Sequence, residues 1–381
     1  ESTVVAVVTD DRRLTMKWRG KTIVGLSRDF LDTNGAVKTT SARVSAPEES
    51  GFFSKETVSG RDVRERWLSN LRDLNVCSQK GLCEKFDSTI GAATVVMPFG
   101  GRYQLTPSDA MVAKVPVLGG KTTTGTLMSF GFNPYLSEWS PFHGAAYAVI
   151  EALTKVASTG GNWRRSRLTL QEYFERVNSD PSRWGKPLAA LLGALWAQLK
   201  LEIPAIGGKD SVSGTFKDMD VPPTLVAFAM APVDVREVIS TELKATDSDL
   251  WLLSTGRGSD ELPDLDMWKA NMDGLYELVK KGMVRSACSV GIGGAAAAVS
   301  KMCFGNMIGA DIDGIDEAAL YVASYGDVVV EAGADAAASL TGLNAVRIGK
   351  TKKDASIRFG GMELSLEEAV EAWREPLEKI F

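Results

Sequence analysis

A glycine-rich segment near the middle of the chain contains residue types that bind phosphate. The segment, IPAIGGKDSVSGTF over residues 203–216, follows a predicted helix and contains Gly207, Gly208, Lys209, Asp210, Ser211 and Ser213. Glycines let backbone N–H groups approach an anion, a lysine supplies positive charge, and serine hydroxyls can donate hydrogen bonds to phosphate oxygens. The order of these residues is not that of a Walker A loop. A tight turn with a salt-bridged lysine explains the same residues equally well, so both interpretations stand.

A second glycine run, GIGG over residues 291–294, precedes a predicted helix of small residues. The backbone amides of Gly293 and Gly294 could cradle an anion there, and close helix packing is an equally good explanation. His143 is the only histidine and stands beside a predicted helix start, where a hydrogen-bonded structural role is commoner than catalysis. A nucleophilic cysteine with a histidine and an acid that would form a catalytic triad cannot be identified.

The composition is that of a globular enzyme. The 381 residues are 44% apolar and 24% charged, with a net charge of −5, and the length favours two domains. No block of lysine and arginine suits a row of nucleic-acid phosphates, and no apolar stretch is long enough for a membrane span. Four cysteines without a C-x-x-C pair do not form a common zinc site with a single histidine. We therefore expect a cytoplasmic protein with reduced thiols and with neither nucleic acid nor membrane as a partner.

The two ends of the chain resemble each other. The first thirty and the last forty residues align so that Val5 and Met16 match Val346 and Ile357. Each copy predicts a strand, a turn, a second strand, a short turn and a helix. We interpret residues 1–45 as the tail of a preceding homologous module, with chance similarity of two amphipathic stretches as the alternative.

The rest of the chain divides into three stretches. Residues 46–85 predict a linker followed by a helix over 62–75, and residues 86–240 predict an α+β domain. Helices are predicted within that domain near 145–158, 170–177 and 188–199. Residues 241–381 alternate strands with helices, which is typical of an α/β domain.

Several motifs together resemble the second half of the synthetase region of formylglycinamide ribonucleotide amidotransferases. The Gly-Lys-Asp-Ser segment is followed by VPPTLVAFAM, residues 221–230, as in that family's second-half signature. Collinear matches are FDSTIGAATVVMPFGGRYQLTPSDAMVAKVPV (86–117), EALTKVASTGG (151–161), DPSRWGKPLAALLGA (180–194) and GLYELVKKGMV (274–284). The similarity covers essentially the whole chain. It implies an aminoimidazole ribonucleotide synthetase-like fold, in which an α+β domain joins its partner in a barrel-like interface and precedes an α/β domain.

The resemblance implies roles for particular residues. Asp109 and Glu151 match family acids that hold magnesium, a cation that prefers oxygen ligands. The residues that would bind ATP are Gly207, Gly208, Lys209, Ser211, Gly293 and Gly294, and those that would be catalytic are Lys209, Asp210 and Ser211. Lys155 stands where the family has Asn or Asp, and Ser289 stands where it has an aspartate ligand. A lysine cannot ligate magnesium, but this one could pair with Glu151 four residues earlier and replace the cation. We therefore expect the metal and nucleotide site of this half to be weakened or remodelled.

The resemblance also implies a reaction and partners. The complete enzyme would use ATP and magnesium to activate an amide oxygen of formylglycinamide ribonucleotide, and ammonia supplied from elsewhere would then form the amidine. The partners would be the preceding synthetase half, the glutaminase domain and this substrate. The isolated fragment is expected to be inactive and could form a homodimer through exposed strands.

Two alternatives to a catalytic half remain at this point. One is a structural or auxiliary nucleotide-binding half without turnover, and a minor one is a member of the superfamily with another small-molecule acceptor. A catalytic role for the Gly-Lys-Asp-Ser segment in this chain predicts that Lys209 lies close to Asp109 and Glu151.

Overall fold

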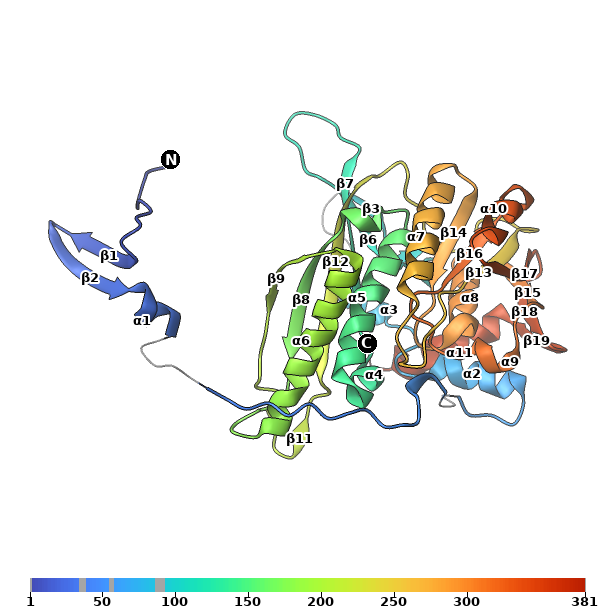
Figure 1. Cartoon of the computed structure of the whole chain (residues 1–381). Coiled ribbons are helices and arrows are strands. Elements are labelled where there is room, and N and C mark those ends of the chain that lie inside the picture. Colours follow the sequence, from blue (N-terminus) through green and yellow to red (C-terminus); the bar gives the residue numbers. More distant parts are fainter. Residues whose placement is uncertain (1, 34–38, 55–57, 86–92, 381) are drawn as a thin grey trace.

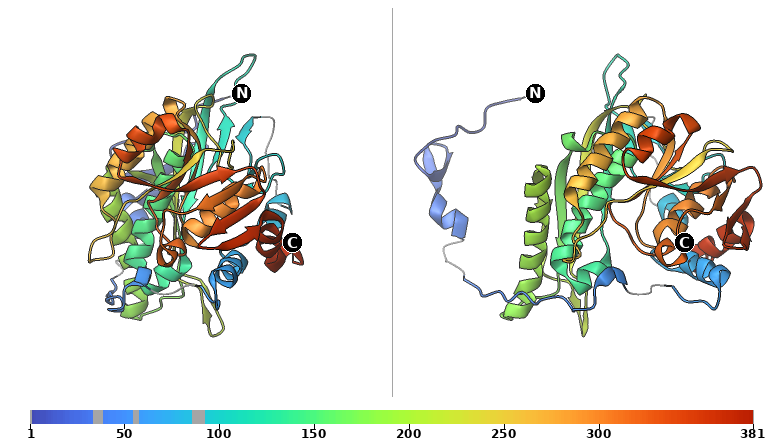
Figure 2. Two further views of the ribbon diagram at one scale, coloured as in Figure 1. Left: turned by 90° about the vertical axis from the view of Figure 1, so that its right-hand side faces the viewer. Right: turned by 45° about the vertical axis from the view of Figure 1, so that its right-hand side comes forward.

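Two β-sheets with their helices form the body of the protein, and an N-terminal hairpin and helix lie apart from it (Figures 1 and 2). The computed structural model describes residues 2–33, 39–54, 58–85 and 93–380. Among these residues no helix combines the length and the apolar character that a membrane span requires.

The N-terminal hairpin has the same order of elements as the C-terminal end. The bounds are β1 (Arg13–Trp18), β2 (Lys21–Ser27) and α1 (Arg28–Thr33), against β18 (Ser356–Phe359), β19 (Met362–Ser365) and α11 (Leu366–Glu378). Both strand pairs are antiparallel. Their surroundings differ, because Trp18 is 63% exposed whereas Ile357 and Leu364 are fully buried. The N-terminal copy therefore has the local structure of the C-terminal copy without its packing.

The first strand predicted for the N-terminal copy is absent. Residues 2–9 are not in a strand, and Val5 is 90% exposed. The matching C-terminal residues lie in β17 (Ala345–Lys352), which is hydrogen-bonded between β13 and β15. An extended segment with no neighbouring strand leaves its backbone groups to solvent, so the same pattern forms a strand only at the C-terminal end.

The first sheet has six strands. Its order is β3 (Thr94–Val96), β6 (Met111–Lys114), β7 (Thr124–Gly131), β12 (Thr224–Asp234), β8 (Arg167–Tyr173) and β9 (Ala205–Lys209). All neighbours are antiparallel except β8 and β9, which are parallel. Two long helices, α5 (Pro141–Ser158) and α6 (Pro181–Leu201), pack side by side, and α5 contacts β7 and β12 (Figure 1). These helices cover one face of the sheet.

The other face of this sheet exposes large apolar side chains. Met128, Phe130 and Met230 alternate with the buried residues of β7 and β12 and are 39%, 53% and 39% exposed. Side chains of successive strand residues point to opposite faces, so the alternation separates a buried face from an open one. We call these three residues, together with Phe228, the open apolar face.

The predicted helix over 170–177 is wrong, because its first residues belong to strand β8. Leu168 and Glu172 are buried while Arg167 and Tyr173 are exposed, which is the period-two pattern of a half-buried strand. The pairing of β8 with β12 and β9 satisfies its backbone groups. The other two helices predicted in this region lie within α5 and α6.

The second sheet has seven strands. Its order is β14 (Val284–Ser289), β16 (Val328–Ala332), β13 (Asp249–Leu253), β17, β15 (Gly309–Ile312), β18 and β19. Strands and helices alternate along this part of the chain as predicted. Only β15 and β18 pair in parallel among these described strands, so the sheet is mainly antiparallel and not the parallel sheet typical of an α/β domain. Alternation along a sequence does not determine which strands become neighbours, and here β13 lies between two strands from much later in the chain.

Shorter elements and the remaining helices complete the body. The helices are α2 (Val63–Arg72), α3 (Lys80–Lys85), α4 (Pro134–Trp139), α7 (Leu265–Lys280), α8 (Gly294–Phe304), α9 (Glu317–Leu320) and α10 (Ala337–Thr341), with 3-10 turns at Phe52–Ser54, Trp163–Arg165 and Ala334–Ala336. The small hairpins are β4 (Phe99–Gly100) with β5 (Thr106–Pro107) and β10 (Thr215–Phe216) with β11 (Met219–Asp220). A continuous apolar cluster joins α5 to α7 and β14 across the predicted boundary at residue 240. Trp268 of α7 donates a 2.9 Å hydrogen bond to Thr154 of α5 in this cluster.

Candidate functional site

Asp109 lies two residues before β6, where it contacts α5 and the second sheet. Its Oδ2 accepts hydrogen bonds from Ser158 Oγ of α5 at 2.6 Å and from the backbone N–H of Ser289 at the end of β14 at 2.7 Å. Burial raises the pKa of Asp109, although the nearby Lys155 ammonium and these hydrogen bonds act in the opposite direction. The carboxylate therefore connects the strand β6, the helix α5 and the strand β14.

Glu151 and Lys155 form a buried ion pair on α5. Lys155 Nζ lies 2.7 Å from Glu151 Oε1, and the two side chains are only 14% and 11% exposed. The other carboxylate oxygen of Glu151 accepts a 3.0 Å hydrogen bond from Phe132 N, and Lys155 Nζ donates a 2.9 Å hydrogen bond to Phe130 O. Burial disfavours the Lys155 ammonium, but Glu151 and Asp109 outweigh it and leave the Lys155 pKa raised. The predicted pairing of these two residues is present.

The glycine-rich turn lies beside these acids. A Cβ placed on Gly291 would be 3.7 Å from Glu151 Oε1, and the Asp109 contact reaches Ser289 two residues earlier. Gly294 has a φ of +65°, and a Cβ there would lie 2.3 Å from Leu320 O. Close packing therefore accounts for this glycine, which is one of the two interpretations that the sequence left open. Asp109, Glu151 and the turn are thus brought together.

A cavity of about 920 Å³ opens at Gly293. Its lining includes the apolar and aromatic residues Phe52, Tyr135 and Tyr321 and the polar residues Asn70 and Arg72. Asn70 donates a 2.9 Å hydrogen bond to Gly293 O, which fixes the turn against α2. A cavity of this size and mixed lining can accept a ligand of nucleotide size.

Lys209 lies away from both acids, contrary to the prediction that the three residues converge. It is the last residue of β9, an edge strand, and its exposed side chain lies over the Tyr173 ring at 5.9 Å. Three strand spacings separate β9 from β7 and four separate it from β6, which corresponds to roughly 14 and 19 Å. The strand order of the sheet, which the sequence does not reveal, keeps the Gly-Lys-Asp-Ser segment at the opposite edge from Asp109.

The Gly-Lys-Asp-Ser segment is also less loop-like than predicted. Gly207 and Gly208 are strand residues of β9, and a Cβ on Gly208 would lie 2.4 Å from Leu170 O. Beyond the strand, Ser211 Oγ and Ser213 Oγ are 2.9 Å apart. Burial, with a smaller contribution from Asp210, raises the pKa of Glu172 on the neighbouring strand to about 7. The Lys209 side chain is exposed, so that its positive charge can bind an anion held by another protein surface.

Magnesium does not fit the residues at Asp109 and Glu151. Both oxygens of Glu151 are already bonded, one of them to the Lys155 ammonium. A magnesium ion requires near-octahedral oxygen coordination at about 2.0–2.1 Å. Within the described ranges, no group of three or more His, Cys, Asp or Glu side chains is arranged to hold a metal ion. The donor set therefore disagrees with the metal site that the family resemblance implies.

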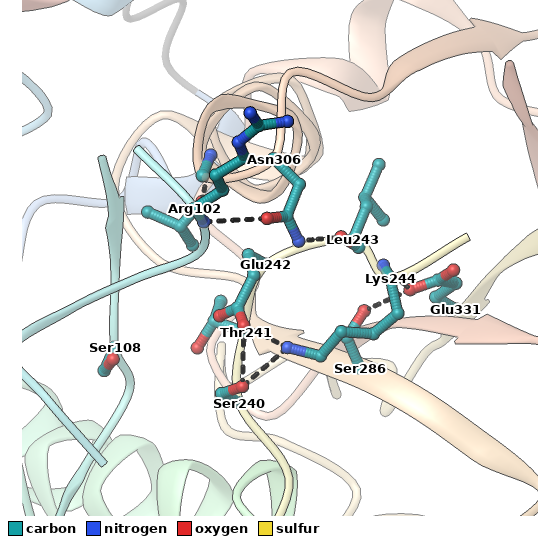
Figure 3. A network of polar contacts seen from close by, with 12 residues as sticks. Arg102, Ser108, Ser240, Thr241, Glu242, Leu243, Lys244, Ser286, Asn306 and Glu331 are labelled. Carbon is teal, nitrogen blue, oxygen red and sulfur yellow. Dashed lines mark hydrogen bonds and ion pairs between the residues drawn. The ribbon is translucent and has the colours of Figure 1, made fainter. Parts of the chain in front are cut away.

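A network around Glu242 and Glu331 was not predicted from the sequence (Figure 3). Lys244 pairs with Glu242, and Ser240 Oγ donates a 2.9 Å hydrogen bond to the same carboxylate. Glu331 is fully buried in β16 and accepts hydrogen bonds from Lys244 N and Ser286 Oγ at 2.7 and 2.8 Å. The available signal was a charged residue within the apolar run DVVVEA. The backbone N–H of Arg102 also donates a 2.8 Å hydrogen bond to Asn306 Oδ1.

His143 and the cysteines have the contacts of structural residues. The two ring nitrogens of His143 lie 2.8 Å from Ser140 Oγ and 2.9 Å from Asp260 O. All four cysteines are free thiols, and burial raises the pKa of Cys288 and Cys303. The contacts of the histidine agree with the structural role expected for it.

The fold is similar to that of a solved PurL structure. Thermotoga maritima PurL complexed with ATP superposes with a TM-score of 0.56 at 16% sequence identity, covering 90% of this chain and 49% of that chain. This likeness places the chain in the aminoimidazole ribonucleotide synthetase-like fold. No family model matches the sequence.

The sequence is also similar to those of particular curated proteins. Phosphoribosylformylglycinamidine synthase subunit PurL from Thermoplasma acidophilum is 25% identical over 334 aligned positions, covering 81% of this chain and 42% of that protein. The corresponding subunit from Nocardioides sp. is 24% identical over 409 aligned positions, covering 99% of this chain and 52% of that protein. The resemblance to formylglycinamide ribonucleotide amidotransferases, which are these synthases, is confirmed. The chain spans about half the length of the curated relatives that it matches.

Proposed function

We propose that this chain acts as the second half of the ATP-dependent synthetase region of a phosphoribosylformylglycinamidine synthase. The observation that carries the proposal is the similarity to PurL subunits over 81% to 99% of the chain. The fold likeness to PurL supports it independently of the motifs. Residues 1–45 are, in this proposal, the tail of the preceding homologous half, because their hairpin and helix repeat the order of elements at the C-terminal end.

In the proposed reaction, ATP phosphorylates an amide oxygen of the substrate, and ammonia then replaces the resulting phosphate group. The carbonyl oxygen of the glycinamide group of formylglycinamide ribonucleotide attacks the γ-phosphorus of ATP and displaces ADP, which leaves an iminophosphate and keeps the formyl group intact. Ammonia from a glutaminase adds to the imidate carbon, and loss of phosphate gives the amidine. Phosphoryl transfer spreads negative charge over the phosphoryl oxygens, so exposed positive groups such as Lys209 suit it.

The preceding half would cover the open apolar face. Met128, Phe130 and Met230 expose a continuous strip of apolar surface on two neighbouring strands. Lys209 points to the same side of the sheet, because it is paired with Gln171 and lies over the exposed Tyr173. A homologous half packed there would bury the strip and bring its own residues to Lys209. The Gly-Lys-Asp-Ser segment would then serve a site between the halves, while Gly293 and its cavity would offer a second place for a nucleotide.

An auxiliary half without turnover is the second candidate function. The buried Lys155–Glu151 pair favours it, because the positively charged lysine takes up the carboxylate that would otherwise hold magnesium beside the glycine-rich turn. In this alternative the chain completes the interface, and the chemistry depends on residues of the other half.

A reconstitution assay separates the two candidates. The chain is mixed with the preceding synthetase half, formylglycinamide ribonucleotide, ATP and ammonium chloride, and amidine formation and ADP release are followed. We expect activity only in the mixture, and we expect Lys209→Ala to abolish it if the segment is catalytic. Lys217→Ala is the matched control, because Lys217 is another lysine beside an aromatic ring outside the segment. Full activity of Lys209→Ala would leave the auxiliary role, and no activity of the wild-type mixture would count against both.

The proposed interface has its own test. Met230→Glu places a charge on the open apolar face, and we expect it to abolish co-elution with the preceding half while leaving the Tm of the chain nearly unchanged. Leu199→Glu is the control, because Leu199 is 69% exposed on α6, on the opposite side of the sheet. Equal association of both variants would contradict the interface.

A further inference from the structure

Lys155 occupies the centre of a site that is lined by oxygens. Its Nζ lies 2.7 Å from Glu151 Oε1 and 2.9 Å from Phe130 O, and it is 4.7 Å from the centroid of the Phe130 ring. The side chain is 14% exposed, so little water reaches it. Carboxylate, carbonyl and aromatic face are three groups that attract a cation.

Glu151 has no carboxylate oxygen left for a second cation. Glu151 Oε2 accepts from Phe132 N, and Asp109 Oδ2 accepts from Ser158 and from the backbone of Ser289. A divalent ion at this cluster would meet an ammonium group that is already bound to Glu151.

Asp109 joins this cluster to the second sheet. Asp109 precedes β6 and bonds to α5 and to the end of β14, while Glu151 and Lys155 belong to α5. An aspartate side chain at position 289 would place a further negative charge beside Asp109, whereas the serine found there adds none. Relative to the family pattern, Lys155 and Ser289 therefore both make the net charge of the cluster more positive.

We propose that the Lys155 ammonium is the resident cation of this cluster, so that the chain holds β14 against α5 without a divalent metal ion. Lys155 supplies permanently, from the chain itself, the positive charge that Asp109 and Glu151 require. This inference is independent of whether the chain takes part in ligation, since its test measures metal binding and not activity.

The test is a titration with MnCl2, in which free Mn²⁺ is followed by electron paramagnetic resonance. The proteins are the wild type, Lys155→Asn, which removes the charge and adds an oxygen ligand, and Lys155→Met, which removes only the charge. We expect no detectable Mn²⁺ binding at this cluster in the wild type, and a Kd for Lys155→Asn at least about tenfold below the lowest wild-type Kd that the titration would detect. The Mn²⁺ affinity of Lys155→Met should lie between those of the wild type and Lys155→Asn. The Tm of the wild type should be the same in MgCl2 and in EDTA, while that of Lys155→Asn should be lower in EDTA and rise in MgCl2.

Lys186→Asn is the matched control. Lys186 pairs with the buried Glu175 at 2.7 Å, and Arg183 stays near that carboxylate, so removing this lysine should create no Mn²⁺ site. Mn²⁺ binding by the wild type that is lost in Asp109→Asn would overturn the proposal, and this arm does not depend on the folding of any Lys155 variant. A Lys155→Asn protein that is folded by circular dichroism but binds Mn²⁺ no better than the wild type would also overturn it.

Discussion

Replacement of Glu331 by glutamine tests whether the second sheet depends on one buried carboxylate. Glu331 is fully buried, and each of its oxygens accepts two hydrogen bonds (Figure 3 shows two of the donors). The donors are Lys244 N at 2.7 Å, Ser286 Oγ at 2.8 Å, Ala245 N at 2.9 Å and Ser248 Oγ at 3.0 Å. The carboxylate therefore fixes the connector between the two sheets to β16.

The cost of Glu331→Gln follows from these four donors. An amide nitrogen replaces one oxygen, and a serine hydroxyl can turn to accept from it, but the backbone N–H on that side cannot. Leaving that N–H without an acceptor costs about 1–3 kcal/mol, and the loss of charge weakens the remaining bonds by about 1 kcal/mol each. We expect the free energy of unfolding to fall by about 3–5 kcal/mol in total.

Urea unfolding followed by tryptophan fluorescence measures this change, since the chain has nine tryptophans. The control is Glu378→Gln, which removes an exposed ion pair with Arg374 on the last helix and should change stability by less than about 0.5 kcal/mol. A loss below about 1 kcal/mol for Glu331→Gln would refute the reasoning, because it would mean that the four hydrogen bonds do not depend on a charged acceptor.

Three further predictions concern single positions. Burial raises the pKa of Glu172 to about 7 in the folded chain from an ordinary value of 4.5. The wild type should therefore lose stability as the pH rises from 4.5 to 7, because the folded chain must give up a proton that it binds more tightly than the unfolded chain does. In thermal unfolding, Glu172→Gln should have a higher Tm than the wild type above pH 7, and this difference should vanish toward pH 4.5. Gly294→Ala should lower the free energy of unfolding by about 2 kcal/mol or more, because it combines a positive φ with a backbone clash, whereas Gly256→Ala, which has a positive φ and open space, should cost about 1 kcal/mol. In Gly185→Ala, a Cβ 1.9 Å from Arg43 O should displace the segment 39–54 from α6, and limited proteolysis should cut that segment faster while the Tm of the body is unchanged.

Local patterns in the sequence predicted much of the fold. The helix over 62–75 and the helices within α5 and α6 follow from apolar spacing, and the hairpin and helix at each end follow from the internal repeat. The helix predicted over 170–177 failed, because a half-buried strand whose buried positions include a glutamate has no clear apolar alternation. Pairing with β12 and β9, which lie distant in the sequence, decided that segment.

The sequence likewise predicted some features of the candidate site and missed others. The sequence identified Asp109, Glu151 and the glycine-rich turn through the family resemblance, and the structure brings them together. It also predicted that Lys155 could pair with Glu151, because residues four apart on a helix are neighbours. It could not show that Lys209 stands at the far edge of the sheet, because strand order depends on contacts between distant segments.

By itself, then, the sequence determined the family resemblance, the types and approximate positions of most elements, and the sign of the charge at position 155. These are properties of short segments, in which periodicity and spacing act directly. Only the tertiary structure decided which strands are neighbours, which carboxylates lose their water and which lysine reaches them. The physical reason is that burial and electrostatic attraction depend on distances between groups that are far apart along the chain, and folding alone sets those distances.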